Sequence, residues 1–116
     1  KHINYFDILI NKSSNHIEKW NGKKYFFYFP EFRAFEGKVN YNFRGIKINE
    51  LREKVKKIAN NANYNVHDFQ NIIFDKYSNP KELFPLEIDN HYSEEAYNLI
   101  ANKILNIIDT NTICNN

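Results

Sequence analysis

The stretch Tyr25-Phe26-Phe27-Tyr28-Phe29-Pro30 decides the fold of this chain. Five aromatic residues follow one another, so both faces of the segment are apolar. An extended segment with two apolar faces is typical of a parallel sheet that helices cover on both sides. Pro30 cannot donate a backbone hydrogen bond to a neighbouring strand, so the strand should end there. The stretch therefore predicts a buried strand over residues 25–29.

A helix and a second strand are expected further along the chain. Asn49 is a candidate N-cap, and the helix it would start, over residues 50–61, carries its apolar residues at helical spacing. Residues 63–67 are expected to be a short strand. A strand, a helix and a strand of these lengths form a right-handed crossover between parallel strands. The predicted class is α/β, as part of a three-layer, flavodoxin-like parallel sheet with flanking helices.

The remaining segments complete this outline. Apolar residues at helical spacing predict a helix over residues 3–20, and residues 31–47 have no sustained period and are expected to be a long loop. Residues 68–77 favour a short helix. The last helix should begin at a Ser93 cap, end near residue 108 and leave a frayed tail from residue 110. Its expected buried residues are Ala96, Tyr97, Ile100, Ala101, Ile104 and Leu105.

Composition excludes several classes of function. The net charge of the 116 residues is +2, with acidic and basic residues interleaved, which argues against a nucleic-acid partner. The single cysteine permits no disulfide framework, and the histidines share no ligand spacing, so neither a metal nor another cofactor is expected. No apolar run reaches the roughly 18 residues that span a membrane. The sequence does not indicate a cellular compartment.

The loop before the last helix carries the residues with the clearest chemical potential. Asp89 and His91 lie two residues apart, and Glu87 precedes them. A histidine that acts as a general base needs a carboxylate within hydrogen-bond reach to orient its ring, and alternate residues of an extended loop point the same way. His91 with Asp89 or Glu87 is therefore a candidate catalytic pair. The plainer interpretation, a polar loop residue that assists the Ser93 cap, stays open.

Two arginines in the predicted loop 31–47 are candidate substrate-binding residues. Arg33 and Arg44 could hold a carboxylate or a phosphate through paired hydrogen bonds. The alternative is that they are ordinary solvated side chains or form ion pairs with the nearby Glu31 and Glu36.

The block from Phe84 to Ala101 resembles the C-terminal block of the SGNH (GDSL-type) esterases and acyltransferases. In that family an Asp-x-x-His pair precedes the last helix, which continues into a Leu-Ile-Ala run like the one at residues 99–101. The segment Trp20–Pro30 is similar to the family's late core strand and the helix end before it. The resemblance covers roughly residues 16–108 in the order of elements.

The resemblance implies a role for His91 as the base of a Ser-His-Asp triad. Ile88 stands three residues before His91, where the family has its aspartate, so that role falls to Asp89 or Glu87. The family's Gly-Asp-Ser nucleophile block has no counterpart, because no serine here is in that context; the serines are Ser13, Ser14, Ser78 and Ser93. The chain is expected to be one α/β domain, residues 1–116, that forms the C-terminal part of a larger one.

Two functional hypotheses follow. The first is the C-terminal part of an SGNH-like serine esterase or acyltransferase acting on an acylated small molecule or saccharide, inactive without a serine from outside this chain. The second is a non-catalytic α/β binding or interaction module that uses the aromatic loop 31–47. Reading the coding sequence upstream of Lys1 would separate them, since a strand followed by Gly-Asp-Ser favours the enzyme.

The predicted strand over residues 25–29 also has a consequence for assembly. If an upstream half is missing, this strand lacks one neighbour, and an aromatic strand with unpaired backbone groups tends to associate. We therefore expect the chain either to self-associate through that edge or to cover it with residues 3–20.

Overall fold

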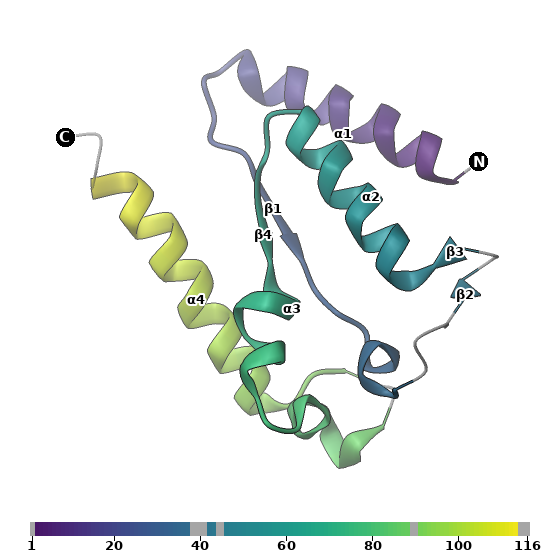
Figure 1. Ribbon diagram of the computed structural model, residues 1–116. Coiled ribbons are helices and arrows are strands. Elements are labelled where there is room, and N and C mark those ends of the chain that lie inside the picture. The colour runs from purple at the N-terminus through teal and green to yellow at the C-terminus, as the bar shows by residue number, and fades with distance from the viewer. Residues whose placement is uncertain (1, 38–41, 44–45, 89–90, 114–116) are drawn as a thin grey trace. The chain divides into compact units, whose positions relative to one another are not determined.

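The computed structural model describes residues 2–37, 42–43, 46–88 and 91–113 (Figure 1). This part of the chain has a mixed α/β structure with four α-helices and a two-stranded parallel sheet flanked by helices, so the predicted α/β class is confirmed. The chain divides into two compact units, the first made of Lys1–Phe29 and Gly37–Asp68 and the second of Pro30–Glu36 and Phe69–Asn116. No helix in these residues is both long and apolar enough to cross a membrane.

The first unit contains the parallel sheet. Strand β1 pairs with β4 in parallel, from Tyr25 opposite Asn65 to Tyr28 opposite Asp68, and helix α2 connects them. The strand, helix and strand predicted over residues 25–67 are therefore confirmed. The elements of this unit are α1 (His2–Glu18), β1 (Tyr25–Tyr28), β2 (Asn42–Phe43), β3 (Ile46–Lys47), α2 (Ile48–Asn61) and β4 (Asn65–Asp68).

Both helices of the first unit pack on one face of the sheet. Ala59, Ala62 and Tyr64 are buried, and partly buried apolar side chains from α1 and from both strands pack against them: Ile10, Ile17, Phe26 and Val66. The ring of Phe6 meets that of Phe26 edge-on at 5.9 Å. Residues 3–20, one expected cover for the strand edge, thus pack on a face of the sheet.

The alternation of strand residues places a second aromatic surface on the opposite face of the sheet. The rings of Tyr25 and Phe27 stack at 6.1 Å along β1. The imidazole of His67, on the neighbouring strand β4, lies 5.6 Å from the Phe27 ring. Aromatic pairs on adjacent strands stabilise a sheet beyond their buried area. The aromatic run therefore supplies both faces of β1, as its composition predicts.

The second unit has a phenylalanine-rich core. Its helices are α3 (Phe69–Ile72), α4 (Glu94–Ile113) and four 3-10 helices, Phe32–Phe35, Phe74–Lys76, Pro80–Leu83 and Pro85–Glu87. The ring of Phe32 meets Phe84 edge-on at 5.2 Å, and Phe35 stacks on Phe74 at 5.7 Å. Phe74 and Phe84 are 0% and 2% exposed, so they form the centre of this core.

Several local predictions need correction. Residues 31–47 are not a plain loop, because they contain a 3-10 helix and the short antiparallel pair β2–β3. Helix α2 begins at Ile48, after an extended Lys47, so Asn49 is not its N-cap. The helix expected over residues 68–77 is split at Ile73, whose φ of −121° and ψ of −64° are not helical. The last helix continues to Ile113 instead of fraying from residue 110.

The buried stripe of α4 also differs from the prediction. Ala96, Ile100 and Ile107 are buried, whereas Tyr97 and Leu105 are 51% and 57% exposed; Ala101 is exposed as well. Residues 97, 101 and 105 follow the line of residues 96, 100 and 104 around the helix at an offset of about 100°. Both lines are apolar, so their spacing alone does not decide which one is buried.

Candidate functional site

The loop that carries His91 is closed at its base by contacts within the second unit. The Ser93 amide donates to the Leu83 carbonyl at 2.9 Å. The ring of Tyr92 lies 5.2 Å from that of Phe84, and its hydroxyl donates to the Pro30 carbonyl. Tyr92 is therefore anchored by its ring and by its hydroxyl. His91, the residue before it, is exposed.

The start of α4 is fixed directly after this anchor. Ser93 Oγ accepts a hydrogen bond from the Ala96 amide at 3.2 Å, and its carbonyl accepts one from the Tyr97 amide at 3.0 Å. The predicted Ser93 cap is thus confirmed. In the first turn, Glu95 accepts a hydrogen bond from the Tyr77 hydroxyl at 2.9 Å, and that carboxylate raises the pKa of Tyr77. The imidazole therefore lies two residues before the serine that caps α4.

Of the two candidate carboxylates, the structure describes Glu87. Glu87 is exposed in a 3-10 helix, and its Oε1 accepts a hydrogen bond from Asn79 Nδ2 at 3.3 Å. Leu86 and Glu87 both have left-handed backbone, with φ of 57° and 52°. Non-glycine residues in that region cost roughly 1 kcal/mol each, so this turn is strained. Asp89 lies outside the described residues. Asn79 is therefore the partner found for Glu87.

Of the two candidate arginines, the structure describes Arg33. Arg33 is an exposed residue of the 3-10 helix Phe32–Phe35. Arg44 lies outside the described residues. The aromatic residues next to Arg33 point into the core of the second unit, since Phe32 is buried and Phe35 stacks on Phe74. Phe32 and Phe35 are thus used for packing.

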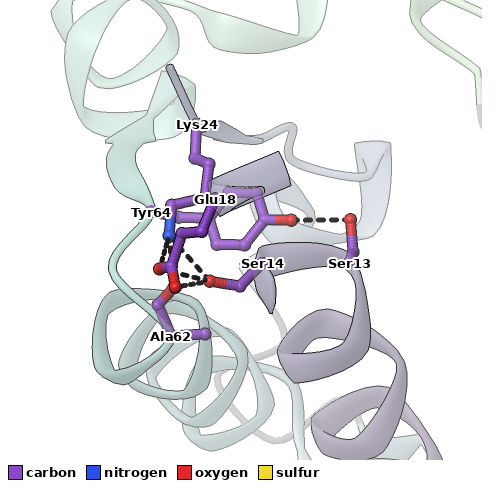
Figure 2. A network of polar contacts seen from close by, with 6 residues as sticks. All are labelled: Ser13, Ser14, Glu18, Lys24, Ala62 and Tyr64. Carbon is purple, nitrogen blue, oxygen red and sulfur yellow. Dashed lines mark hydrogen bonds and ion pairs between the residues drawn. The ribbon is translucent and has the colours of Figure 1, made fainter. Parts of the chain in front are cut away.

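A second polar cluster lies in the first unit and includes a buried serine (Figure 2). Ser14 Oγ donates to the Ala62 carbonyl at 2.7 Å and accepts from Lys24 Nζ, also at 2.7 Å. Lys24 Nζ in turn lies 2.5 Å from Glu18 Oε1. The cluster joins helix α1 to the C-terminal end of α2, because Ala62 is the residue that caps α2.

The pair of Ser14 and Lys24 resembles a nucleophile beside a base, but its charges argue against that role. The hydrogen bond and the charge of Lys24 lower the pKa of Glu18, which places a carboxylate beside an ammonium group. Lys24 Nζ already donates to Ser14 Oγ, to Glu18 Oε1 and to the Ala62 carbonyl, so it is placed as a donor to the serine and not as an acceptor of its proton. We therefore assign this cluster a structural role, in agreement with the prediction that Ser13 and Ser14 lie within a helix.

Charged residues also gather where β4 ends. Asp68 Oδ2 accepts from Arg52 Nε and from Lys56 Nζ, both at 2.8 Å. The Arg52 guanidinium also lies 5.7 Å from the centre of the Tyr28 ring. Burial alone would raise the pKa of Asp68, but the hydrogen bonds from Lys56 and Arg52 prevail and lower it. The three side chains thus neutralise one another in part and fix α2 to the end of the sheet.

Sequence reasoning missed both clusters for the same reason. Lys24, Arg52 and Lys56 appear in the sequence as ordinary surface residues of a charged chain, yet their side chains are 8%, 11% and 19% exposed. A weak signal was present in Asp68, a carboxylate at the end of a predicted strand. Its partners, 12 and 16 residues earlier in the chain, could not be paired with it without the crossover geometry.

Comparison with known proteins leaves the candidate site to be judged by its own chemistry. The chain matches no protein-family model, and neither the curated proteins nor the solved structures include a significant match.

Proposed function

We propose that this chain is the C-terminal part of an SGNH-like serine esterase or acyltransferase and that it supplies the histidine of the triad. One observation carries the proposal: an exposed imidazole precedes a tyrosine anchored by its ring and hydroxyl, and it lies two residues before the serine that caps a helix. The sequence resemblance places the histidine of that family at the same position, His91. The substrate class that it suggests is an acylated small molecule or saccharide.

In this proposal His91 acts as a general base and then as a general acid. The imidazole takes the proton of a serine hydroxyl, contributed from outside this chain, as that oxygen attacks the ester carbonyl. It then gives the proton to the departing alcohol. Water or an acceptor hydroxyl releases the acyl group in a second cycle of the same proton transfers. Asp89 or Glu87 would hold the ring in the productive tautomer.

The anchoring of Tyr92 supports this role for its neighbour. A catalytic base must keep its nitrogen within hydrogen-bond reach of the nucleophile, and a displacement of about 1 Å can cost a hundredfold in rate. Tyr92 is attached to Phe84 through its ring and to Pro30 through its hydroxyl. These contacts restrict the backbone of the adjacent His91, although its side chain is exposed.

The first experiment tests the 116-residue chain itself. We expect no turnover of p-nitrophenyl acetate above the buffer rate and no labelling by a fluorophosphonate probe, because Ser14 is buried and bonded and no serine follows a Gly-Asp pair. Covalent labelling of Ser13, Ser14, Ser78 or Ser93, mapped by mass spectrometry, would contradict the proposal, and so would ester turnover by this chain.

The second experiment tests His91 in the polypeptide encoded by the complete reading frame. We expect esterase activity that His91→Gln lowers by about a thousandfold or more, the usual cost of removing a triad member. His16→Gln, a change of the same chemistry at an exposed position of α1, is the matched control and should retain activity. Full activity of the His91→Gln protein would refute the proposal.

The same assay assigns the carboxylate. Glu87 already accepts a hydrogen bond from Asn79, so we expect Asp89→Asn to lower kcat strongly and Glu87→Gln to change it by less than about threefold. The opposite ranking would give the triad position to Glu87.

The alternative, a binding module that uses the aromatic loop 31–47, gains no support from the described part of that loop. Phe32 is 6% exposed, and Phe35 packs on Phe74 and Phe84. Aromatic residues that bind a partner are expected on the surface. The observed packing of Phe32 and Phe35 therefore gives no support to the alternative.

A further inference from the structure

The outer side of helix α1 carries large apolar side chains that are exposed to solvent. The inner side of this helix is used for packing, since Ser14 is buried and bonds to the Ala62 carbonyl at the end of α2 (Figure 2). On the outer side, Tyr5, Ile8 and Leu9 are 56%, 51% and 64% exposed. They form one cluster, because residues three and four apart are neighbours on a helix. A cluster of exposed large apolar side chains typically marks an interaction site.

Basic residues share this outer side, whereas the acidic residues of α1 do not. The exposed Lys12 and His16 fall within the same arc of about 100° as the three apolar residues. Asp7 and Glu18 lie at least about 80° outside this arc, and Glu18 is paired with Lys24. The outer face of α1 is therefore apolar and basic, and it consists of Tyr5, Ile8, Leu9, Lys12 and His16.

The end of α1 adds an exposed tryptophan and another lysine. The Trp20 amide donates to the Ile17 carbonyl at 3.2 Å, so the chain still turns as a helix there. The Trp20 ring lies over Gly22, because a Cβ added to that glycine would come within 2.7 Å of the ring. Trp20 is nevertheless 64% exposed, and Lys19 is exposed beside it. The ring is thus held in place and still open to a partner.

We propose that the outer face of α1, together with Lys19 and Trp20, binds the surface of an anionic lipid bilayer. The apolar side chains enter the boundary between headgroups and acyl chains, and the ammonium groups of Lys12 and Lys19 contact the anionic headgroups. Lysine suits both regions, because its stem is apolar and its end is charged. Tyrosine and tryptophan are likewise favoured at this boundary, since each joins an apolar ring to a polar group. This attachment is independent of the proposed esterase function.

Shape and charge favour a bilayer over a second copy of this chain. A two-fold contact between copies would place the face against itself and bring the lysines of both copies together without a counter-charge. From Tyr5 to Trp20 the exposed apolar side chains extend over about 20 Å along a convex helix. A flat anionic surface contacts such a ridge along its whole length. An acidic groove of another protein is a different occupant, for which polyglutamate is the probe.

Tryptophan fluorescence with lipid vesicles tests the proposal in the 116-residue chain, because Trp20 is its single tryptophan. Vesicles of phosphatidylcholine with about 30% phosphatidylserine should shift the emission to shorter wavelength and carry the chain into the pellet on centrifugation. Vesicles of phosphatidylcholine alone should bind about tenfold more weakly or less, because the attraction of the lysines is lost. Sodium chloride at about 0.5 M should weaken binding to the anionic vesicles, since it screens exposed charges.

Two variants separate the apolar contribution from the charged one. Leu9→Gln should lower the partition coefficient about tenfold on anionic vesicles, because the leucine side chain no longer gains from leaving water. Lys12→Gln/Lys19→Gln should lower it about tenfold or more on anionic vesicles and change it by less than about twofold on phosphatidylcholine alone.

Matched controls make the same changes at exposed positions of the second unit. Leu105→Gln in α4 and Lys76→Gln/Lys103→Gln should leave the partition coefficient within about twofold. Circular dichroism must show that each variant is folded. Control variants that weaken binding as much as the α1 variants would overturn the proposal, because the effect would then follow overall charge and hydropathy.

Three further outcomes would also overturn it. The first is a chain that binds no vesicles of either composition. The second is a Trp20 emission that polyglutamate shifts and vesicles do not, which would assign the face to an acidic protein. The third is a dimer, seen by sedimentation velocity without lipid, that Leu9→Gln converts to a monomer, because a second copy would then cover the face.

Discussion

Arg52 and Asp68 form a one-sided ion pair at the end of the parallel sheet. Arg52 Nε and Nη2 lie 2.8 Å and 2.6 Å from the same oxygen, Oδ2. The other oxygen, Oδ1, is buried, and no donor of the described residues reaches it. A buried carboxylate with one bare oxygen depends strongly on its cationic partners, because it lacks the hydrogen bonds that water would supply. This dependence makes Asp68 the most informative position for stability measurements.

Replacement of Asp68 by alanine should destabilise the first unit. The change leaves the partly buried Arg52 and Lys56 without their shared carboxylate. Breaking a fully buried pair typically costs about 3 kcal/mol or more and breaking an exposed pair at most about 1 kcal/mol, so we expect a loss of about 2 kcal/mol here. Urea unfolding at pH 7, followed by circular dichroism, measures the loss. Asp75→Ala, at an exposed carboxylate, should change the free energy of unfolding by less than about 0.5 kcal/mol. Equal effects of the two variants would contradict the assigned burial.

Stability should fall in acid because of the same carboxylate. The pKa of Asp68 is lowered in the folded chain, and that of Glu18 is lowered by Lys24. A lowered pKa stabilises the folded state above the unfolded pKa of about 4, and this stabilisation is lost as the pH falls through the folded value. The free energy of unfolding should therefore drop progressively below about pH 5.

Urea unfolding at several pH values between 2.5 and 6 measures this slope. Asp68→Asn should flatten it, since the amide does not titrate in this range. Ser93→Ala is the control. It should lower the free energy of unfolding of the second unit but leave the pH slope unchanged, because it alters no ionisable group. A slope unchanged by Asp68→Asn would show that other carboxylates dominate acid unfolding.

Ser14 should matter to stability although it has no expected catalytic role. Ser14→Ala removes the 2.7 Å hydrogen bond to the Ala62 carbonyl and leaves that carbonyl with Lys24 Nζ at 3.4 Å. Loss of a buried hydrogen bond with one partner left behind costs about 1–2 kcal/mol. The same unfolding assay measures it, with the exposed Ser78→Ala as control. If Ser14→Ala left the free energy of unfolding unchanged, water would replace the hydroxyl, and the α1–α2 connection would be weaker than its geometry indicates.

The Ser93 cap should contribute to the stability of α4. Ser93→Ala removes the acceptor for the Ala96 amide, and the loss of such a cap typically costs about 1 kcal/mol. Ser93→Asp retains an acceptor and adds a negative charge at the positive end of the helix, so it should restore or exceed the original stability. Thermal unfolding of the three proteins ranks them. If alanine and aspartate proved equivalent, the serine hydroxyl would not act as the cap.

The sequence predicted the elements whose signals are local. The aromatic run Tyr25–Phe29 predicted β1 because a short run with two apolar faces is typical of a strand covered on both sides. The helical spacing after residue 50 predicted α2. Ser93 was recognised as a cap because capping depends on a side chain and the next three residues. The sequence likewise identified His91 as a candidate, but the hydrogen bond of Glu87 to Asn79 was not foreseeable from the spacing of residues 87–91.

Tertiary structure decided the features that join distant residues. The surface that α4 meets decides which of its two apolar lines is buried. From the sequence alone, Tyr97 and Ala96 were equally good candidates for burial, but Ala96 is buried and Tyr97 is exposed. The burial of Lys24, Arg52 and Lys56 likewise requires acceptors that only the folded crossover brings within reach. The sequence alone thus determined α1, β1, α2, β4 and α4 in their order, because backbone preference and periodicity are local. The tertiary structure determined the paired charges and the anchoring of Tyr92, because these depend on contacts between segments far apart in the chain.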